Sequence, residues 1–169
     1  MDVVIIAEII GWVATGFGFT SYMSKDLNRM RILGSIALFL FTISTYLNGA
    51  TNGAVVSAFG FSVRVLSIYI SISWVLALRI LTIIAAAAFF ALFNSEGIYG
   101  ILPSIGLIMA TIGDTQTDIL KTKFIYLGNL GAWLIYTIYL ESPSAIAYEV
   151  LGLSALLYTI TQIKKERKN

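Results

Sequence analysis

The middle of the chain is a long apolar stretch of 40 residues, 54–93. A single α-helix of that length would be about 60 Å long, twice the hydrocarbon core of a bilayer. The stretch therefore predicts two membrane-spanning helices with a turn near Ser71–Ser73, where Tyr69 and Trp74 are suited to anchor the chain at the membrane interface. The second of these helices, residues 73–93, lies near the middle of the sequence.

The rest of the sequence continues this pattern. Hydrophobic residues make up 58% of the 169 residues and charged residues 12%, about half the charged share of a soluble domain. Apolar blocks separated by short polar turns predict an all-α membrane protein with seven transmembrane helices and no soluble domain. The expected spans are residues 3–22, 32–47, 54–70, 73–93, 101–112, 124–140 and 145–163. The first lacks the basic start of a cleaved signal peptide, so we expect it to be retained.

Basic residues gather in two of the turns and in the tail. If residues 54–93 form two helices, all of these basic clusters fall on the same side of the membrane, whereas one long helix would separate them. The positive-inside rule therefore predicts an N-terminus outside and a C-terminus in the cytoplasm. The clusters are Lys25, Arg29 and Arg31; Lys121 and Lys123; and Lys164, Lys165, Arg167 and Lys168, while Glu96 and Glu141 fall in outside loops.

The two halves of the chain follow one plan: a span, a basic turn, a span, a short polar turn and a span. This plan predicts a first triple-helix repeat at 1–72, a linker helix at 73–93 and a second repeat at 94–169 with a basic tail. Three spans plus one linker give both repeats the same orientation, a 3+1+3 parallel repeat. The alternative is seven helices with accidental symmetry.

Several short motifs resemble a known family. They are the run from Glu8 to Trp12, the run from Ser21 to Asp26, Gly34, the Asn48–Gly53 turn, Arg64, and Gly128 with Trp133 before the turn at 141–144. Together they resemble the bacterial inner-membrane family of YgjV type. More distantly, the 3+1+3 plan is similar to the SWEET/PQ-loop superfamily, including nicotinamide riboside carriers of PnuC type. That likeness implies two triple-helix bundles with a translocation path between them. The chain departs from it, because Pro103 and Pro143 both lie in the second half and the Pro-Gln pair is absent.

Two arginines lie inside predicted spans, Arg64 and Arg79. A charge at the centre of a bilayer costs about 2.5–3.5 kcal/mol on insertion scales, so each needs an explanation. One is an anion site or an inner gate on the solute path. The other is snorkelling of the long side chain toward the inner headgroups.

Two glutamates, Glu8 and Glu149, lie about a turn inside the outer ends of the first and last spans. Each is a candidate cation- or proton-binding carboxylate at the outer mouth, or else a carboxylate that tilts into outer water. Ser57 occupies the position of Glu149 in the other repeat.

Asn129, Trp133 and Tyr136 are spaced to share one face of the sixth span. An amide beside flat aromatic rings suits a small polar or ring-bearing solute, although Asn and Ser also hydrogen-bond between packed helices. The matching positions of the second span are Ser35, Phe39 and Thr42.

The leading hypothesis is a small-solute transporter or facilitator that works between two triple-helix bundles. The alternative is a non-transporting, partner-binding or receptor-like protein on the same fold. The chain has no His and no Cys, so we expect no enzyme activity, no catalytic residue, no metal site and no cofactor. Expected partners are the lipid bilayer and a small polar solute but not nucleic acid, and the sequence is compatible with a homo-oligomer.

Overall fold

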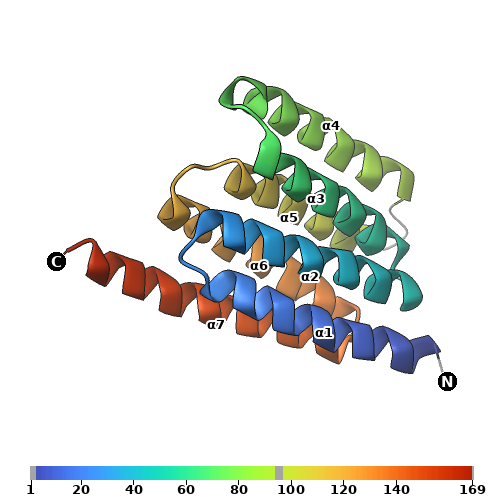
Figure 1. The fold of residues 1–169 in the computed structure, drawn as a ribbon. Coiled ribbons are helices and arrows are strands. Elements are labelled where there is room, and N and C mark those ends of the chain that lie inside the picture. Colours follow the sequence, from blue (N-terminus) through green and yellow to red (C-terminus); the bar gives the residue numbers. More distant parts are fainter. Residues whose placement is uncertain (1–2, 94–96, 169) are drawn as a thin grey trace.

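A computed structural model describes residues 3–93 and 97–168 (Figure 1). Glu96 lies outside these residues. The described chain is all helical and contains no strand, in agreement with the predicted class. Its helices are α1 (Val3–Met23), α2 (Leu27–Leu47), α3 (Thr51–Tyr69), α4 (Val75–Phe93), α5 (Ile101–Asp114), α6 (Ile119–Tyr139) and α7 (Pro143–Glu166), with short 3-10 turns at Ile72–Trp74 and Gly97–Gly100.

Six of these helices are long and apolar enough to cross a membrane, counting the 3-10 turn Gly97–Gly100 together with α5. The exception is α6, which has 21 residues but whose mean hydropathy over a membrane-length window falls below that of the other six. The prediction of seven apolar helices is thus confirmed for six by composition, and the seventh helix is present at its expected place.

The helices form a ring with one helix outside it. Going round the ring, α1 packs against α2, α2 against α3, α3 against α5, α5 against α6, α6 against α7, and α7 against α1. By contrast, α4 packs mainly against the outer side of α3 and α5, at the edge of the bundle in Figure 1. The interior of the molecule is therefore built by six helices, and α4 contributes mainly to the lipid-facing surface.

The predicted break in the long apolar stretch is confirmed. Helix α3 ends at Tyr69, Ile70 is extended, and α4 begins at Val75 after the 3-10 turn. The hydroxyl groups of Ser71 and Ser73 lie 2.8 Å apart in the turn between them. Helices α3 and α4 therefore run in opposite directions.

Two helices begin five residues earlier than predicted. The side chain of Asp26 accepts a hydrogen bond from the Arg29 backbone N–H at 2.6 Å, and that of Asp118 accepts one from the Lys121 N–H at 2.9 Å. Both are N-caps, so α2 begins at Leu27 and α6 at Ile119. The expected turns were too long: the basic residues of both clusters, Lys25 excepted, lie within the first two turns of helices.

Lys123 differs from the other basic residues, because it is fully buried. Its ammonium group donates to the backbone carbonyl of Tyr22 at 2.6 Å. This carbonyl lies in the last turn of α1, where carbonyls lack helical partners and a positive charge is favourable. Its assignment to a turn was wrong, since Lys123 lies in α6 and ties that helix to the end of α1.

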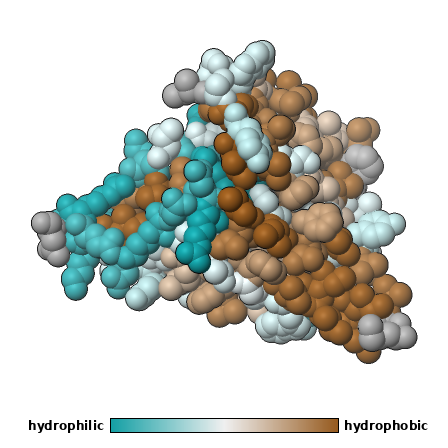
Figure 2. Space-filling model, in the orientation of Figure 1, coloured by the Kyte–Doolittle hydropathy of each residue, from teal (hydrophilic) through white to brown (hydrophobic). Residues whose placement is uncertain are grey.

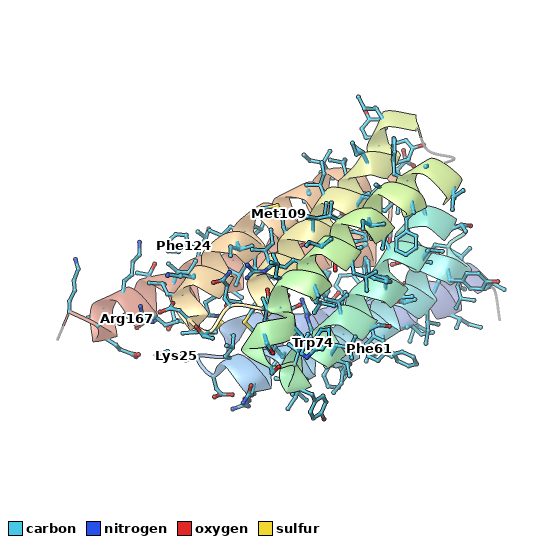
Figure 3. The ribbon with its side chains drawn as sticks, turned by 90° about the horizontal axis from the view of Figure 1, so that it is seen from above. Lys25, Phe61, Trp74, Met109, Phe124 and Arg167 are labelled. Atoms are coloured by element: carbon cyan, nitrogen blue, oxygen red, sulfur yellow. The ribbon has the colours of Figure 1, made fainter. Side chains whose placement is uncertain are left out.

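The remaining basic residues of the three clusters gather at one end of the bundle, which we call the basic end. Lys25 forms an ion pair with Glu166, and Arg167 pairs with Asp118 at 2.9 Å, so the tail contacts both turns. Figure 2 shows the hydrophilic surface gathered on the side of the C-terminus, and Figure 3 shows Lys25 and Arg167 at that same end. The common location of the clusters agrees with the charge argument made from the sequence.

Candidate functional site

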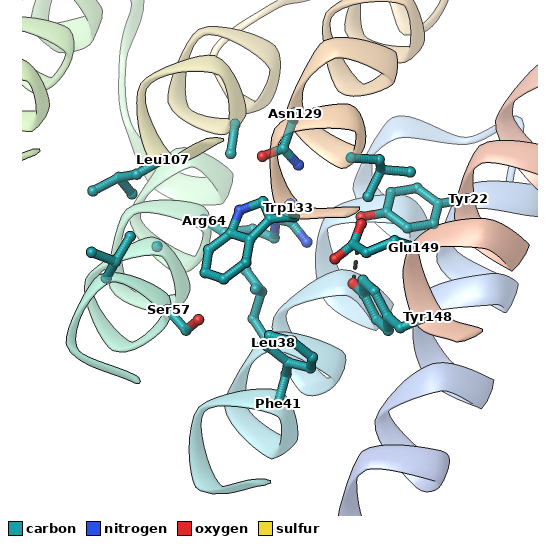
Figure 4. A pocket seen from close by; sticks show the side chains of 14 residues that line it. Tyr22, Leu38, Phe41, Ser57, Arg64, Leu107, Asn129, Trp133, Tyr148 and Glu149 are labelled. Atoms are coloured by element: carbon teal, nitrogen blue, oxygen red, sulfur yellow. Dashed lines mark hydrogen bonds between the residues drawn. The ribbon is translucent and has the colours of Figure 1, made fainter. Parts of the chain in front are cut away.

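The ring encloses a small central cavity that all six of its helices line (Figure 4). Its volume is about 30 Å³, which is room for one or two water molecules and not for a sugar or nucleoside. Most of the wall is apolar and comes from side chains such as Leu38, Phe41, Val56 and Leu107. The few polar groups that face the cavity therefore determine what it can bind.

Three of these polar groups have no hydrogen-bond partner among the residues that the structure describes. They are the Ser57 hydroxyl oxygen on α3, the Asn129 amide oxygen on α6 and one carboxyl oxygen of Glu149 on α7. The residues are 1%, 5% and 2% exposed, respectively. Buried polar atoms are nearly always paired, because leaving one unpaired costs about 1–3 kcal/mol. Three such oxygens around one cavity indicate a place for a ligand or water that donates hydrogen bonds.

Arg64 also lines the cavity, but its charge is already compensated. Its Nε lies 3.0 Å from Oδ2 of Asp114, and each of these side chains is 4% exposed. A second nitrogen donates to the Tyr126 hydroxyl, and the guanidinium carbon lies 5.1 Å from the centre of that ring. The snorkelling alternative is wrong for Arg64, because the guanidinium group remains inside the bundle.

The position of Arg64 depends on a close approach between helices. A Cβ atom added at Gly34 on α2 would lie 2.3 Å from a guanidinium nitrogen of Arg64. Any larger residue there would force the guanidinium group to shift. The glycine is thus a steric requirement of the buried ion pair.

Three tyrosines surround this ion pair. The hydroxyl groups of Tyr22 and Tyr148 lie 3.4 Å apart, and the rings of Tyr22 and Tyr126 are 5.8 Å apart between centres. All three are buried. They come from α1, α6 and α7, so together with Arg64 and Asp114 they form a polar layer across the ring. None of the three tyrosines was predicted from the sequence, and Asp114 was assigned to a turn.

The structure brings together five of the residues predicted for the solute path. Ser57, Arg64, Asn129, Trp133 and Glu149 all line the central cavity. The Trp133 ring meets that of Phe41 nearly edge-on at 5.9 Å between centres. Glu149 is buried inside the bundle, so the alternative that its carboxylate tilts into outer water was wrong.

The other three residues predicted for the path do not line the cavity. The Ser35 hydroxyl donates to the Arg31 carbonyl and that of Thr42 to the Leu38 carbonyl, each at 2.8 Å. Tyr136 is fully buried against α3, where its hydroxyl would lie 2.7 Å from a Cβ added at Gly53.

The expected face of α2 was also shifted. Phe39 is exposed and points away from the interior, whereas Leu38 and Phe41 line the cavity. The alignment of the two repeats had predicted the inward-facing residues of α2 one position away from those that line the cavity.

The two residues considered as gate or coupling charges lie outside the cavity. Glu8 accepts hydrogen bonds from the Ser142 hydroxyl and the Ser144 backbone N–H, both at 3.1 Å, and so caps the start of α7. Arg79 donates from Nε to the Thr115 hydroxyl at 2.9 Å and lines a separate pocket at the basic end. No group of three potential metal-ligating residues occurs in the part of the chain that the structure describes.

Six helices that are long and apolar enough to cross a bilayer define an integral membrane protein. A family model described as bacterial inner membrane protein, Imp-YgjV, matches residues 5–167. The chain therefore belongs to this family, as the sequence motifs predicted, and is a protein of the bacterial inner membrane. Searches of curated proteins and of solved structures find no match.

Proposed function

We propose that the protein is a carrier or facilitator for a small polar solute, working between two triple-helix bundles. The bundles are α1–α3 and α5–α7, with α4 as the linker between them. The observation that carries the proposal is the group of three unpartnered oxygens, on Ser57, Asn129 and Glu149, around one central cavity. A buried binding site between two bundles is where a rocking carrier holds its solute.

The order of helix contacts supports the division into two bundles. A parallel repeat relates α1 to α5, α2 to α6 and α3 to α7. It therefore requires the α3–α5 junction to have a counterpart between α7 and α1, and both junctions are present. Ser57 and Glu149, which the sequence aligns between repeats, line the cavity from opposite bundles.

Both ends of the proposed path are closed. At the basic end, the Arg64–Asp114 pair joins α3 to α5, and the Tyr22–Tyr148 contact joins α1 to α7. Toward the other end, the Asn52 amide donates to the Gly100 carbonyl at 2.9 Å, and Glu8 caps α7. This form is occluded, and a solute enters when one set of contacts separates.

The charges around the cavity favour a solute that donates hydrogen bonds. Arg64 and Asp114 compensate each other, which leaves Glu149 as the unpaired acid in the wall. The unpartnered atoms are oxygens that accept hydrogen bonds. An amine or a hydroxyl-rich solute satisfies them better than an anion does.

The competing function is that of a non-transporting, partner-binding protein. The volume of the cavity, about 30 Å³, favours it, since no solute fits without rearrangement. In that case the polar layer would be a permanent packing feature, and the protein would hold the same closed form in every condition.

Flux through reconstituted protein distinguishes the two functions. Uptake into proteoliposomes is measured over a panel of amines, sugars, nucleosides and vitamins. We expect uptake of at least one class, abolished by Glu149→Gln and strongly reduced by Ser57→Ala. Glu166→Gln and Ser62→Ala are matched controls, because both side chains are exposed and lie away from the cavity. Absence of flux across the whole panel, with folded protein in the vesicles, contradicts the carrier.

We further propose that the basic end faces the cytoplasm, with the N-terminus outside. The chain has no native cysteine, so single cysteines report exposure directly. A membrane-impermeant maleimide added to intact spheroplasts should label Glu141→Cys and leave Ser73→Cys unlabelled until the membrane is opened. The reverse pattern would invert the orientation.

A further inference from the structure

A second pocket lies at the basic end, apart from the central cavity. It opens between the end of α3, the start of α4 and the loop after α5, and its volume is about 560 Å³. Two arginines line it, Arg31 from α2 and Arg79 from α4, together with Thr115, Gln116 and Thr117. This volume falls within the range of small-molecule sites, about 300–1,000 Å³.

No ion pair between described residues takes up the positive charge of this pocket. The ion pairs formed by described residues involve Lys25, Arg64 and Arg167, so neither arginine of the pocket has a carboxylate partner. Arg79 donates to a neutral hydroxyl, and Arg31 donates to the carbonyls of Asp114 and Gln116. The Nε of Arg31 is buried and has no hydrogen-bond partner within residues 3–93 and 97–168. Guanidinium groups in this state match the oxygens of a phosphate.

An apolar groove continues from the pocket along the lipid-facing side of the bundle. It lies between α4 and α5, has a volume of about 240 Å³, and shares Leu76 and Arg79 with the pocket. Its walls are Ile80 and Ile83 on one helix and Ile108 and Ile112 on the other. A charged pocket that runs into an apolar groove has the polarity of a phospholipid, with a head and one acyl chain.

The depth of the pocket relative to the membrane surface also suits a phospholipid. Tyr69 and Trp74 flank the turn between α3 and α4 and are 83% and 65% exposed. Exposed tyrosine and tryptophan side chains of membrane proteins concentrate at the headgroup level. Arg79 lies about one and a half turns deeper than Trp74, within reach of a lipid phosphate by its long side chain.

We propose that the pocket binds one anionic phospholipid of the leaflet at the basic end. Its phosphate contacts Arg31 and Arg79, and one acyl chain lies in the groove between α4 and α5. The lipid would fill the space beside the helix that has the fewest protein neighbours, and so would hold α4 against the ring. This proposal is independent of whether the protein transports a solute.

The test compares ligands that carry only part of the proposed chemistry. Full-length protein in detergent is titrated with phosphatidylglycerol, with phosphatidylcholine of the same acyl chains, and with inorganic phosphate. Native mass spectrometry counts bound lipid, and thermal unfolding reports stabilisation. We expect one phosphatidylglycerol to bind more tightly than any phosphatidylcholine and to raise the unfolding temperature, while phosphate alone gives little shift.

Two variants locate the site. Arg79→Gln should weaken binding of the first phosphatidylglycerol by about fivefold, the effect of one basic residue near a membrane surface. Ile83→Trp should weaken it by filling the groove without changing the charge. Arg29→Gln removes the same charge from an exposed residue of the basic end outside the pocket, and should bind as the wild type does.

Several results would overturn the proposal. Equal affinity for the two lipids would remove the role of the headgroup charge. An equal loss in Arg29→Gln would reduce the effect to general attraction of the basic end. Full stabilisation by inorganic phosphate would assign the pocket to a soluble anion.

Discussion

Arg64 and Arg79 lie at similar distances on either side of the turn between α3 and α4, but their surroundings in the structure differ. Each lies about one to one and a half turns from the end of its helix at the break between α3 and α4, at a similar depth from the basic end. Arg64 is 3% exposed and holds both a carboxylate and a tyrosine hydroxyl. Arg79 is only partly buried, and its hydrogen bond goes to a neutral hydroxyl beside an open pocket.

The difference follows from where the two helices pack. Helix α3 belongs to the ring, so a charge on its inner face cannot reach water and must be compensated by another buried group. Helix α4 packs on the outside, where a long side chain reaches the headgroup layer. The same residue type therefore has a structural role in one helix and an accessible charge in the other.

The largest expected effect comes from breaking the buried pair. Arg64→Met leaves the Asp114 carboxylate buried and unpaired, which should lower the free energy of unfolding by about 3 kcal/mol or more. Arg79→Met should change it by less than about 1 kcal/mol. Thermal and denaturant unfolding in detergent measure both. Similar losses of unfolding free energy in the two variants would contradict the distinction between a buried, paired arginine and an accessible one.

The next effect concerns packing within the ring. A Cβ at Gly18 on α1 would lie 2.3 Å from a ring carbon of Tyr148, whereas one at Gly16 on the same helix would meet nothing within 4 Å. Gly18→Ala should cost about 1–3 kcal/mol by overpacking. Gly16→Ala should be neutral or slightly stabilising, because alanine favours helices. The comparison uses one helix and one chemical change, so helix propensity cancels.

A smaller effect is expected at the end of the bundle opposite the basic end. Glu8→Gln removes the negative charge that caps α7 and should cost about 1 kcal/mol. Glu141→Gln at the same end serves as the control, since Glu141 is exposed. If both variants unfold at the wild-type temperature, the capping interaction contributes nothing measurable.

The smallest effect is a pH dependence at the basic end. The pKa of the Asp118 carboxyl lies below its usual value, because the Lys121 backbone N–H and then the Arg167 side chain donate to it. A lowered folded-state pKa adds stability above the unfolded-state pKa of about 4, and that stability is lost as the pH falls through the lower value. The unfolding temperature should therefore decrease slightly below about pH 4 in the wild type, and less in Asp118→Asn. Equal slopes would contradict this role.

Much of the fold could be predicted from the sequence, because hydrophobic length and charge placement are strong signals in membrane proteins. They predicted the helices and the break at Ser71–Ser73. The starts of α2 and α6 were misplaced because basic residues were assigned to turns. The N-caps Asp26 and Asp118 stand directly before the observed starts of α2 and α6. Recognised as caps in the sequence, they would have indicated these earlier starts.

The site was harder to predict, because it depends on which helix faces meet. Nothing in the periodicity of α3 indicates that Arg64 faces α5, so Asp114 was not recognised as its partner. The rule that an intramembrane charge needs a partner could have directed attention to that acid. Tyr22, Tyr126 and Tyr148 carry no comparable signal, since tyrosine is common throughout such helices.

The limited apolarity of α6 has a consequence for the biogenesis of the protein. This helix contributes Asn129 and Trp133 to the cavity and buries Lys123 and Tyr126, and it is not among the helices apolar enough to span a membrane alone. Insertion from the translocon depends on the summed hydrophobicity of a segment. We therefore expect α6 to enter the bilayer only together with α5 or α7. The polar side chains that α6 contributes to the interior of the ring thus make its insertion depend on that of a neighbouring helix.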